Sequence, residues 1–385
     1  MKKIIILSLI LTNVIYALSD KERKEAITQA AEKDNLEQFL YYSQLNGTEL
    51  EVLIYASRYD AIKIAEFAIK SGANVNQQNK KGWTALMSSA YTNSYNVCNL
   101  LIKAGADINL TQQNGWTALM FAAATKNSQE VTELLIKLGA IVDQQNDQGE
   151  TALIIASKFG NISQAKILLK AGANVNQKDN KGNTSLLTPI QNSLLENYNV
   201  YSLEQEREFT GTMGHLILDP DALKAEPKLI NMLVRFGAEI NVQNINGQTP
   251  LIQASESNDY DRVRYLIHHK ADINYQDNLG QTALMVALKV FQKSKIFDIS
   301  EAGMNTYDIH RDSIENRVFI DFSKGEDQEL ISKITRVVVL LIQSGADVNH
   351  RDKNLFTPLI LLENYKSPKL AEIFRKILLS AGATA

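Results

Sequence analysis

The feature that most constrains this chain is a segment of about 33 residues that recurs along most of its length. Each copy ends in a threonine followed by a small residue or proline and then leucine, and these threonines are Thr84, Thr117, Thr151, Thr184, Thr249, Thr282 and Thr357. The first four are separated by 33, 34 and 33 residues. A repeat of this length is typical of a solenoid, in which each unit buries its apolar face only against its neighbours.

Each copy predicts two helices joined by a polar turn. In the first complete copy, apolar residues follow Thr84 directly, which predicts a short buried helix capped by the threonine side chain. Val97 and Leu101 belong to a second apolar stretch with helical spacing, and Gly105 is expected to end that helix in the left-handed conformation. The polar residues between Gly105 and Thr117 favour a hairpin-like finger.

This pattern resembles the ankyrin repeat, and the resemblance covers residues 47–385 almost entirely. It implies an all-α solenoid of stacked helix-turn-helix units with hairpin-like finger loops. The histidine that the family usually carries after its Thr-Pro-Leu triplet is absent, and apolar residues replace it at Met87, Met120, Ile154, Leu187, Ile252, Met285 and Ile360. We expect this replacement to lose a polar link between repeats and to gain buried surface. Lys270 and Leu355 stand where glycine is expected, so we expect those two turns to be adjusted.

The repeats divide the chain into about nine units. Residues 20–80 are predicted to hold an N-terminal capping helix pair and a degenerate repeat, and residues 81–192 to hold regular repeats. Regular repeats resume over 226–290, and 334–385 hold the final repeat and a C-terminal cap. Atypical end units are expected because the terminal faces of a solenoid must be shielded from water.

Two intervals between repeat threonines are too long, at 65 and 75 residues. Counting back from the next glycine cap places an insertion at residues 193–225 in the sixth repeat and another at residues 291–333 in the eighth. Both fall between the two helices of their repeat, so both are expected to emerge on the same edge of the stack. Two interpretations stay open: the insertions meet in a lobe over the seventh repeat, or they are tolerated surface decoration.

The first residues predict export. Two lysines precede an apolar run over residues 4–11, and small residues at Ala17 and Ser19 offer a cleavage site. This arrangement is typical of a secretory signal peptide, here residues 1–19. The apolar run is shorter than the about 20 residues that cross a bilayer, so no membrane span is expected after cleavage. We therefore expect a periplasmic or secreted protein of bacterial type.

Composition and motifs argue against several classes of function. The 40 basic and 43 acidic residues give a formal net charge of −3, which offers no basic face for nucleic acid. The sequence carries no recognised catalytic or metal-binding motif, so we expect no enzyme activity, no cofactor and no metal. The single cysteine, Cys98, is expected to be a buried thiol. His268 and His269 are expected to be surface or packing residues, because neighbours on a helix point in different directions.

The resemblance implies that partners bind the fingers and the concave side of the first helices. The residue before each repeat threonine is variable, and both tryptophans of the chain occupy this place. The candidate protein-binding residues are Trp83, Tyr91, Trp116, Thr125, Glu150, Lys158 and Phe159. The tryptophans have two interpretations, since an exposed tryptophan is a favoured binding residue but each ring also suits packing over its own finger.

These observations predict an exported, monomeric scaffold that binds an unidentified protein partner. One alternative is that the two insertions build an enzyme or small-ligand-binding lobe on the scaffold. Another is a secreted effector that binds a host protein. The fold indicates a mode of recognition, whereas the identity of the target depends on particular surface residues.

Overall fold

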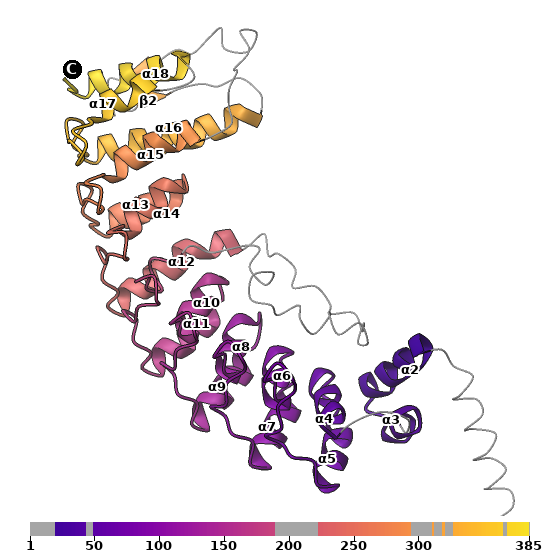
Figure 1. The fold of residues 1–385 in the computed structure, drawn as a ribbon. Helices are drawn as coiled ribbons and strands as arrows, with labels where there is room; N and C mark the ends of the chain where they lie inside the picture. Colours follow the sequence, from indigo (N-terminus) through magenta and orange to yellow (C-terminus); the bar gives the residue numbers. More distant parts are fainter. Residues whose placement is uncertain are drawn as a thin grey trace, which may run out of the picture. The chain divides into compact units, whose positions relative to one another are not determined.

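The computed structural model describes most of the repeats. Described residues are 20–43, 49–188, 222–293, 310–311, 318–319, 326–364 and 368–384. The predicted signal peptide lies outside them, as does most of each predicted insertion. The chain divides into two compact units (Figure 1), the first formed by residues 1–180 with 190–225 and the second by residues 181–189 with 226–385.

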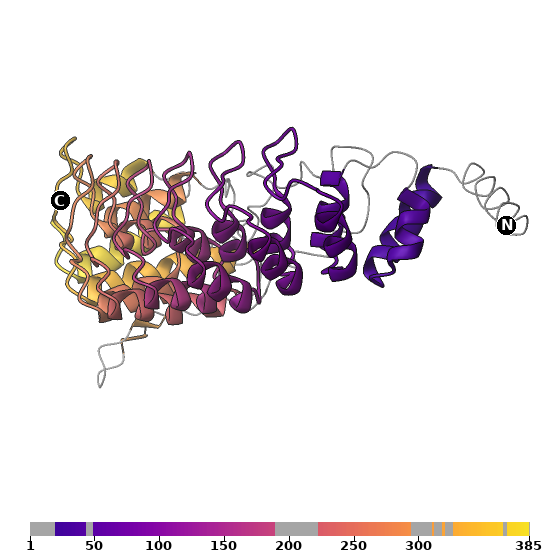
Figure 2. The same cartoon turned by 90° about the horizontal axis from the view of Figure 1, so that it is seen from below.

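The first unit is a stack of helix pairs. Its helices are α2 (Asp20–Glu32), α3 (Leu36–Ser43), α4 (Glu49–Arg58), α5 (Ile62–Lys70), α6 (Ala85–Tyr91), α7 (Tyr95–Lys103), α8 (Ala118–Ala124), α9 (Gln129–Lys137), α10 (Ala152–Lys158) and α11 (Ile162–Lys170). The first helices of successive pairs, α4, α6, α8 and α10, pack in one layer. The second helices, α5, α7, α9 and α11, pack in the other. Figure 2 shows the fingers projecting as hairpins from one side of the stack.

The second unit repeats this arrangement. It holds most of α12 (Ala222–Arg235), then α13 (Pro250–Glu256), α14 (Tyr260–His268), α15 (Ala283–Lys293), α16 (Glu326–Gln343), α17 (Pro358–Leu361), the 3-10 helix η4 (Leu362–Asn364) and α18 (Pro368–Ser380). Helices α15 and α16 are longer than the equivalent helices of the first unit. Helix α15 packs against α13 and α17, and α14 packs against α16. Both ends of the predicted insertion 291–333 are helical, because α15 extends to Lys293 and α16 begins at Glu326.

A two-residue strand pair lies within that insertion. Strands β1 (His310–Arg311) and β2 (Val318–Phe319) are antiparallel, with His310 opposite Phe319. All the longer elements of the described residues are helices, so the all-α prediction is confirmed.

Hydrogen bonds confirm five of the seven predicted threonine caps, whereas the buried hydroxyls of Thr184 and Thr282 have no hydrogen-bond partner among the described residues. The side-chain Oγ1 atoms of five threonines accept the backbone N–H three residues later at 3.2–3.3 Å, and these are Thr84, Thr117, Thr151, Thr249 and Thr357. The residue that receives each cap stands at the position of the family's histidine. All seven of these apolar residues are buried except Ile360, which is half-buried. The expected gain of buried surface is therefore also confirmed.

Neighbouring fingers are joined by a backbone ladder. Within the first unit, the N–H of Gln113 donates to the carbonyl of Lys81 at 3.2 Å, and the N–H of Asp147 donates to that of Asn114 at 3.1 Å. Within the second unit, the N–H of Lys353 donates to the carbonyl of Leu279 at 3.0 Å. This close approach demands glycine: a Cβ added to the finger glycines, such as Gly149, would lie 2.5–3.0 Å from the next finger.

The turns at Lys270 and Leu355 are adjusted in φ, which is 91–106° at the glycines equivalent to Lys270 and 75–79° at those equivalent to Leu355. Both residues keep the left-handed conformation, with φ of 64°. Lys270 fits because an added Cβ at equivalent glycines such as Gly105 meets nothing within 4 Å. Leu355 fits because no later finger packs on its own finger in the part of the chain that the structure describes. Each substitution therefore costs only the left-handed backbone, about 1–2 kcal/mol.

Candidate functional site

The candidate site is a row of side-chain pairs on the first helices. The residue before each repeat threonine, here called the slot residue, meets the residue eight positions later near the end of the first helix. Contacts of this kind are Trp83 with Tyr91, Glu150 with Lys158, Gln248 with Glu256, and Gln281 with Lys289. We call them slot pairs. The first two lie in the first unit and the other two in the second.

The slot pair of the third repeat belongs to an aromatic cluster. The rings of Trp83 and Tyr91 meet edge to face, with their centroids 6.0 Å apart. Phe121, on α8 of the next repeat, lies 4.3 Å from Trp83, 6.2 Å from Tyr91 and 5.0 Å from Trp116, measured between ring centroids. Trp83, Trp116 and Phe121 are all at most 4% exposed. This cluster therefore joins two repeats through aromatic packing.

The interpretation of Trp83 and Trp116 as exposed binding residues is corrected by this burial. Each indole turns toward Phe121, so its surface is covered by the protein itself. The alternative interpretation, in which each ring packs over its own finger, agrees better with the structure. Trp83 also contacts Phe121 of the next repeat. Phe121 was missed by the sequence analysis. The sequence does distinguish this position: Phe121 is aromatic, whereas the equivalent residues Ser88 and Ile155 are not.

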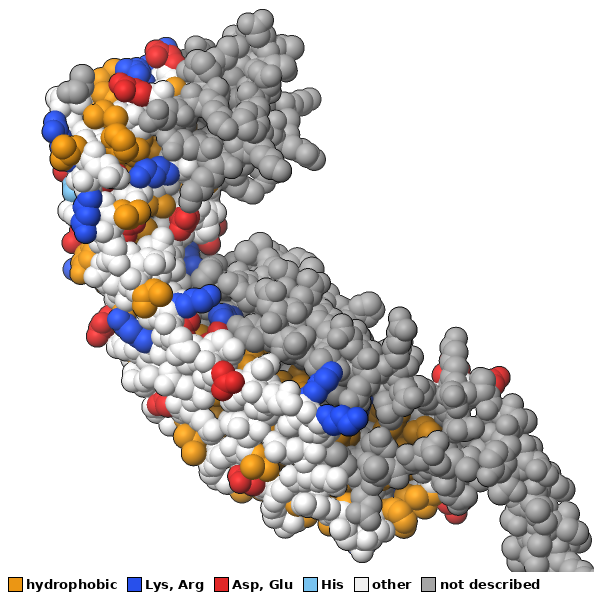
Figure 3. Space-filling view, in the orientation of Figure 1, with side chains coloured by type: hydrophobic (Ala, Val, Ile, Leu, Met, Phe, Trp, Pro, Cys, Tyr) orange, Lys and Arg blue, Asp and Glu red, His pale blue; other side chains and the backbone are white. Residues whose placement is uncertain are grey.

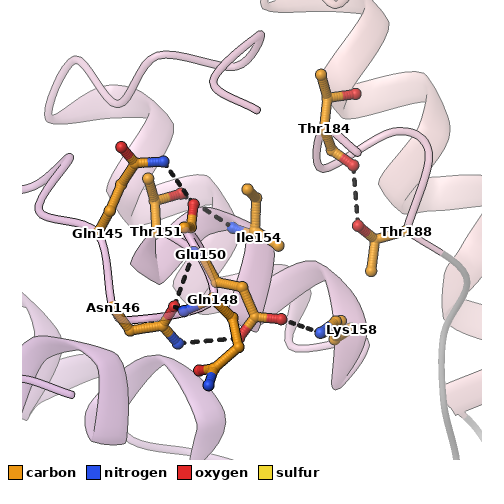
Figure 4. Close-up of polar contacts among 10 residues, drawn as sticks. Gln145, Asn146, Gln148, Glu150, Thr151, Ile154, Lys158, Thr184 and Thr188 are labelled. Atoms are coloured by element: carbon orange, nitrogen blue, oxygen red, sulfur yellow. Dashed lines mark hydrogen bonds and ion pairs between the residues drawn. The ribbon is translucent and has the colours of Figure 1, made fainter. Parts of the chain in front are cut away.

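The fifth repeat replaces this aromatic contact by a buried ion pair (Figure 4). The carboxylate of Glu150 pairs with the ammonium of Lys158, and their side chains are 3% and 13% exposed. Asn146 supports the carboxylate, because its Nδ2 donates to Glu150 Oε2 at 2.9 Å and its Oδ1 accepts the backbone N–H of Glu150 at 2.8 Å. A buried carboxylate is tolerated only with such partners.

In each slot pair of the second unit, one partner is an uncharged glutamine and the other is a charged residue. Gln248 Nε2 donates to Glu256 Oε2 at 3.1 Å, and Lys289 Nζ donates to Gln281 Oε1 at 2.9 Å. Lys289 also lies 3.5 Å from Asp352 Oδ2, on the next finger. The same geometry thus holds an aromatic pair, an ion pair and two amide pairs in different repeats.

Thr125 and Phe159 occupy equivalent positions one residue beyond the slot pairs. The hydroxyl of Thr125 donates to the carbonyls of Tyr91 and Phe121, both at 2.9 Å, so it links two repeats. Phe159 is half-buried, as are Tyr91, Thr125 and Lys158. All seven predicted residues therefore lie at the ends of α6, α8 and α10 or within two residues of them, and only these four are partly exposed.

The remaining titratable candidates show structural roles. Cys98 is buried as expected; burial, opposed by a hydrogen bond with Ser89 and aided by the charge of Asp60, raises the pKa of its thiol to about 12. The rings of His268 and His269 meet edge to face, 5.4 Å between centroids. Among the described residues, no group of three or more His, Cys, Asp or Glu side chains is placed to hold a metal. No helix within the described ranges is long and apolar enough to cross a membrane.

Repetition separates the positions that build the solenoid from those that vary. In each copy, the capping threonine and the residues two and three positions after it have the same character, because they belong to the shared core. A comparison with known families identifies the repeat. Residues 26–112, 104–179 and 221–299 match the family described as ankyrin repeats (3 copies), and together they span more than half of the chain. This protein is therefore a member of the ankyrin-repeat family.

Proposed function

We propose that this protein is an exported scaffold that binds another protein through the slot-pair face of its first unit. Ankyrin repeats generally mediate protein–protein interaction, and ankyrin-repeat proteins are typically non-enzymatic scaffolds. The observation that carries the proposal is the change of chemistry along the slot pairs on an otherwise repeated framework. Positions that differ between repeats while the framework repeats are those free to serve recognition.

The accessible part of this face has a definite character. Tyr91 and Phe159 offer half-buried aromatic rings at the ends of α6 and α10, and Lys158 adds a cation held by Glu150. Aromatic side chains that are already immobilised lose little conformational entropy on binding. The face therefore suits a partner that contributes apolar side chains and a hydrogen-bond acceptor for Lys158.

Repeats of the chain itself supply the test of this face. The triple variant Glu150→Gln, Lys158→Glu, Phe159→Ser gives the fifth repeat the residues of the seventh, namely Gln248, Glu256 and Ser257. Because that slot pair already exists in the second unit, the helical content and thermal midpoint are expected to stay close to those of the parent chain. Partners captured from periplasmic and secreted fractions by the parent chain, and identified by mass spectrometry, should be lost.

The matched control makes the reverse exchange in the second unit. Gln248→Glu with Glu256→Lys creates an ion pair there and should leave capture unchanged. If the triple variant captures the same proteins as the parent chain, the proposed face is wrong. Loss of capture in both variants would point to a general effect on folding, which the thermal midpoints would reveal.

Export is the second part of the proposal. It rests on the two lysines, the apolar run over residues 4–11 and the small residues Ala17 and Ser19. We expect mass spectrometry of the protein recovered from the periplasm or the medium to find a new N-terminus near Ala17 or Ser19. Recovery of the intact N-terminus in the cytoplasm would contradict it.

The other functions predicted from sequence depend on regions that the structure mostly leaves undescribed. A lobe with enzyme or ligand-binding activity needs the insertions at 193–225 and 291–333, of which only helical ends and the short strand pair are described. An effector for a host protein differs from the scaffold in destination rather than in binding chemistry. Neither alternative is favoured by a specific contact.

A further inference from the structure

The finger tips of the second unit carry exposed apolar side chains. Ile245, Leu279, Leu355 and Phe356 are 64%, 57%, 67% and 38% exposed. The first-unit residues that correspond to Ile245 and Leu279 are polar, namely Lys80, Lys81, Gln113, Asn114, Asp147 and Gln148. Phe356 is a slot residue and corresponds to Trp83, Trp116 and Glu150. Single exposed apolar residues are ordinary, but a group of them on neighbouring loops marks an interaction surface.

The backbone ladder places these side chains on adjacent fingers. Asn278 Nδ2 donates to the carbonyl of Ile245 at 2.9 Å, which joins the seventh finger to the eighth. The N–H of Lys353 donates to the carbonyl of Leu279 at 3.0 Å, which joins the eighth finger to the last. Three hydrogen-bonded fingers thus carry the four residues Ile245, Leu279, Leu355 and Phe356, here called the apolar finger edge.

The charge beside the apolar finger edge is positive. Arg351 and Lys353 are exposed on the last finger and form no ion pair within the described part of the chain. The tip carboxylates point inward instead: Asp277 Oδ1 accepts the backbone N–H groups of Leu279 and Gln281 at 2.8 and 2.9 Å. Asp352 likewise accepts the N–H groups of its own finger at 2.9 and 3.0 Å. Figure 3 shows hydrophobic and basic side chains along this side of the second unit.

Backbone strain at Leu355 supports a role for this edge. Six fingers carry glycine at this position, whereas Leu355 adopts a φ of 64° at a cost of about 1–2 kcal/mol. Its side chain is the most exposed of the four, so burial offsets little of this strain. Strain that is little offset within the chain is a reason to infer a binding role.

We propose that the apolar finger edge docks a segment of a partner protein in which apolar side chains are flanked by Asp or Glu. This inference rests on the proposed scaffold function and adds a second surface with a stated partner chemistry. Arg351 and Lys353 select against a second copy of this chain, because a two-fold contact would bring like charges together. Two cations are also few for stable attachment to an anionic bilayer, where each contributes about 1 kcal/mol.

Short random peptides displayed on phage provide the probe, selected on the full chain. The apolar-edge variant combines Ile245→Gln, Leu279→Asn, Leu355→Gly and Phe356→Gln. Each new residue already occurs at the equivalent position of another finger, as Gln113, Asn114, Gly280 and Gln281. Selected peptides should combine apolar residues with Asp or Glu and should bind this variant about tenfold or more weakly. The charge variant Arg351→Gln with Lys353→Gln should weaken binding less and remove its salt dependence.

Other outcomes overturn the inference in distinguishable ways. Peptides that are basic, or that bind the apolar-edge variant as well as the parent chain, exclude this partner chemistry. Concentration-dependent dimers abolished by the apolar-edge variant would identify a second copy as the occupant. Binding to phosphatidylcholine–phosphatidylserine vesicles lost in that variant would identify a membrane.

A parallel arm keeps this result separate from the proposed function. Peptides lost on the slot-pair triple variant of Glu150, Lys158 and Phe159, but retained on the apolar-edge variant, would support the first surface and overturn the second. The opposite pattern would support the apolar finger edge alone. Melting curves of both variants confirm that neither result comes from unfolding.

Discussion

The two units use the same finger ladder but place their apolar side chains oppositely. In the first unit, Trp83 and Trp116 occupy variable slots and are buried against Phe121, while the finger tips are polar. In the second unit the slots hold Gln248, Gln281 and the exposed Phe356, and the finger tips carry the exposed side chains of Ile245, Leu279 and Leu355. The repeat therefore determines the backbone, whereas contacts with a neighbouring repeat determine whether a variable side chain is buried or exposed.

Truncating the residue that covers the indoles should give the largest effect. Phe121→Ala is expected to reduce the free energy of unfolding by about 3–5 kcal/mol, because it removes a buried ring shared by two repeats. The matched control is Val286→Ala, at the same position of the second unit, which should cost roughly half as much. Urea denaturation followed by circular dichroism measures both, and equal losses would contradict the proposed difference between the units.

Cys98 offers a local readout for that experiment. It is the single cysteine of the chain, lies on α7 of the first unit and is buried with a raised pKa, so thiol reagents reach it only when this region opens. Phe121→Ala should therefore accelerate labelling of Cys98 much more than Val286→Ala does. Equal acceleration by the two variants would mean that the aromatic cluster does not stabilise the first unit locally.

Finger glycines should be the next most sensitive positions. Gly149→Ala places a Cβ 2.5 Å from Asn180 Oδ1 in a left-handed backbone, so we expect a loss of about 3 kcal/mol. Gly105→Ala has the same backbone requirement but open space, and should cost only about 1 kcal/mol. Thermal and urea unfolding compare the two variants. A similar loss in both would show that finger approach does not constrain the glycine.

Breaking the slot pair of the first unit should cost more than breaking its counterpart. Lys158→Ala leaves the carboxylate of Glu150 buried without its cation, and we expect a loss of about 2–3 kcal/mol. Lys289→Ala removes a more exposed cation from Gln281 and from the buried carboxylate of Asp352, which still accepts two backbone N–H groups, and should cost about 1 kcal/mol. Adding Glu150→Gln to the Lys158 variant should recover part of the stability. No recovery would argue against an uncompensated carboxylate as the cause.

The smallest effects should come from relieving strain in the second unit. Lys270→Gly and Leu355→Gly should each stabilise the fold by about 0.5–1 kcal/mol, since the gain from relaxing a positive φ exceeds the entropy that glycine adds to the unfolded chain. Lys270→Ala keeps the Cβ and serves as the control, with no gain expected. Differential scanning calorimetry measures these shifts. A gain in the alanine variant would place the effect in the lysine side chain rather than the backbone.

Much of the fold follows from local rules that single repeats obey. Thr84 caps its helix because a hydroxyl three residues before an N–H satisfies an otherwise unpaired donor. Met87 is buried because it lies on the apolar face of a short helix. Such features recur in most copies, so the periodic sequence predicts them together. Whether Lys270 and Leu355 could keep a left-handed turn depended on the space for a Cβ, which sequence does not reveal.

The sequence by itself determined the repeat length, the helix pairs, the caps and the row of variable slots, because each depends on residues close together in one repeat. Only the tertiary structure decided which variable side chains are accessible. Trp83 is covered because Phe121, which lies on the next repeat, meets it; Leu279 and Leu355 stay exposed on their finger tips. Exposure is a property of contacts between repeats, and the residues that make those contacts lie about 33 or more positions apart.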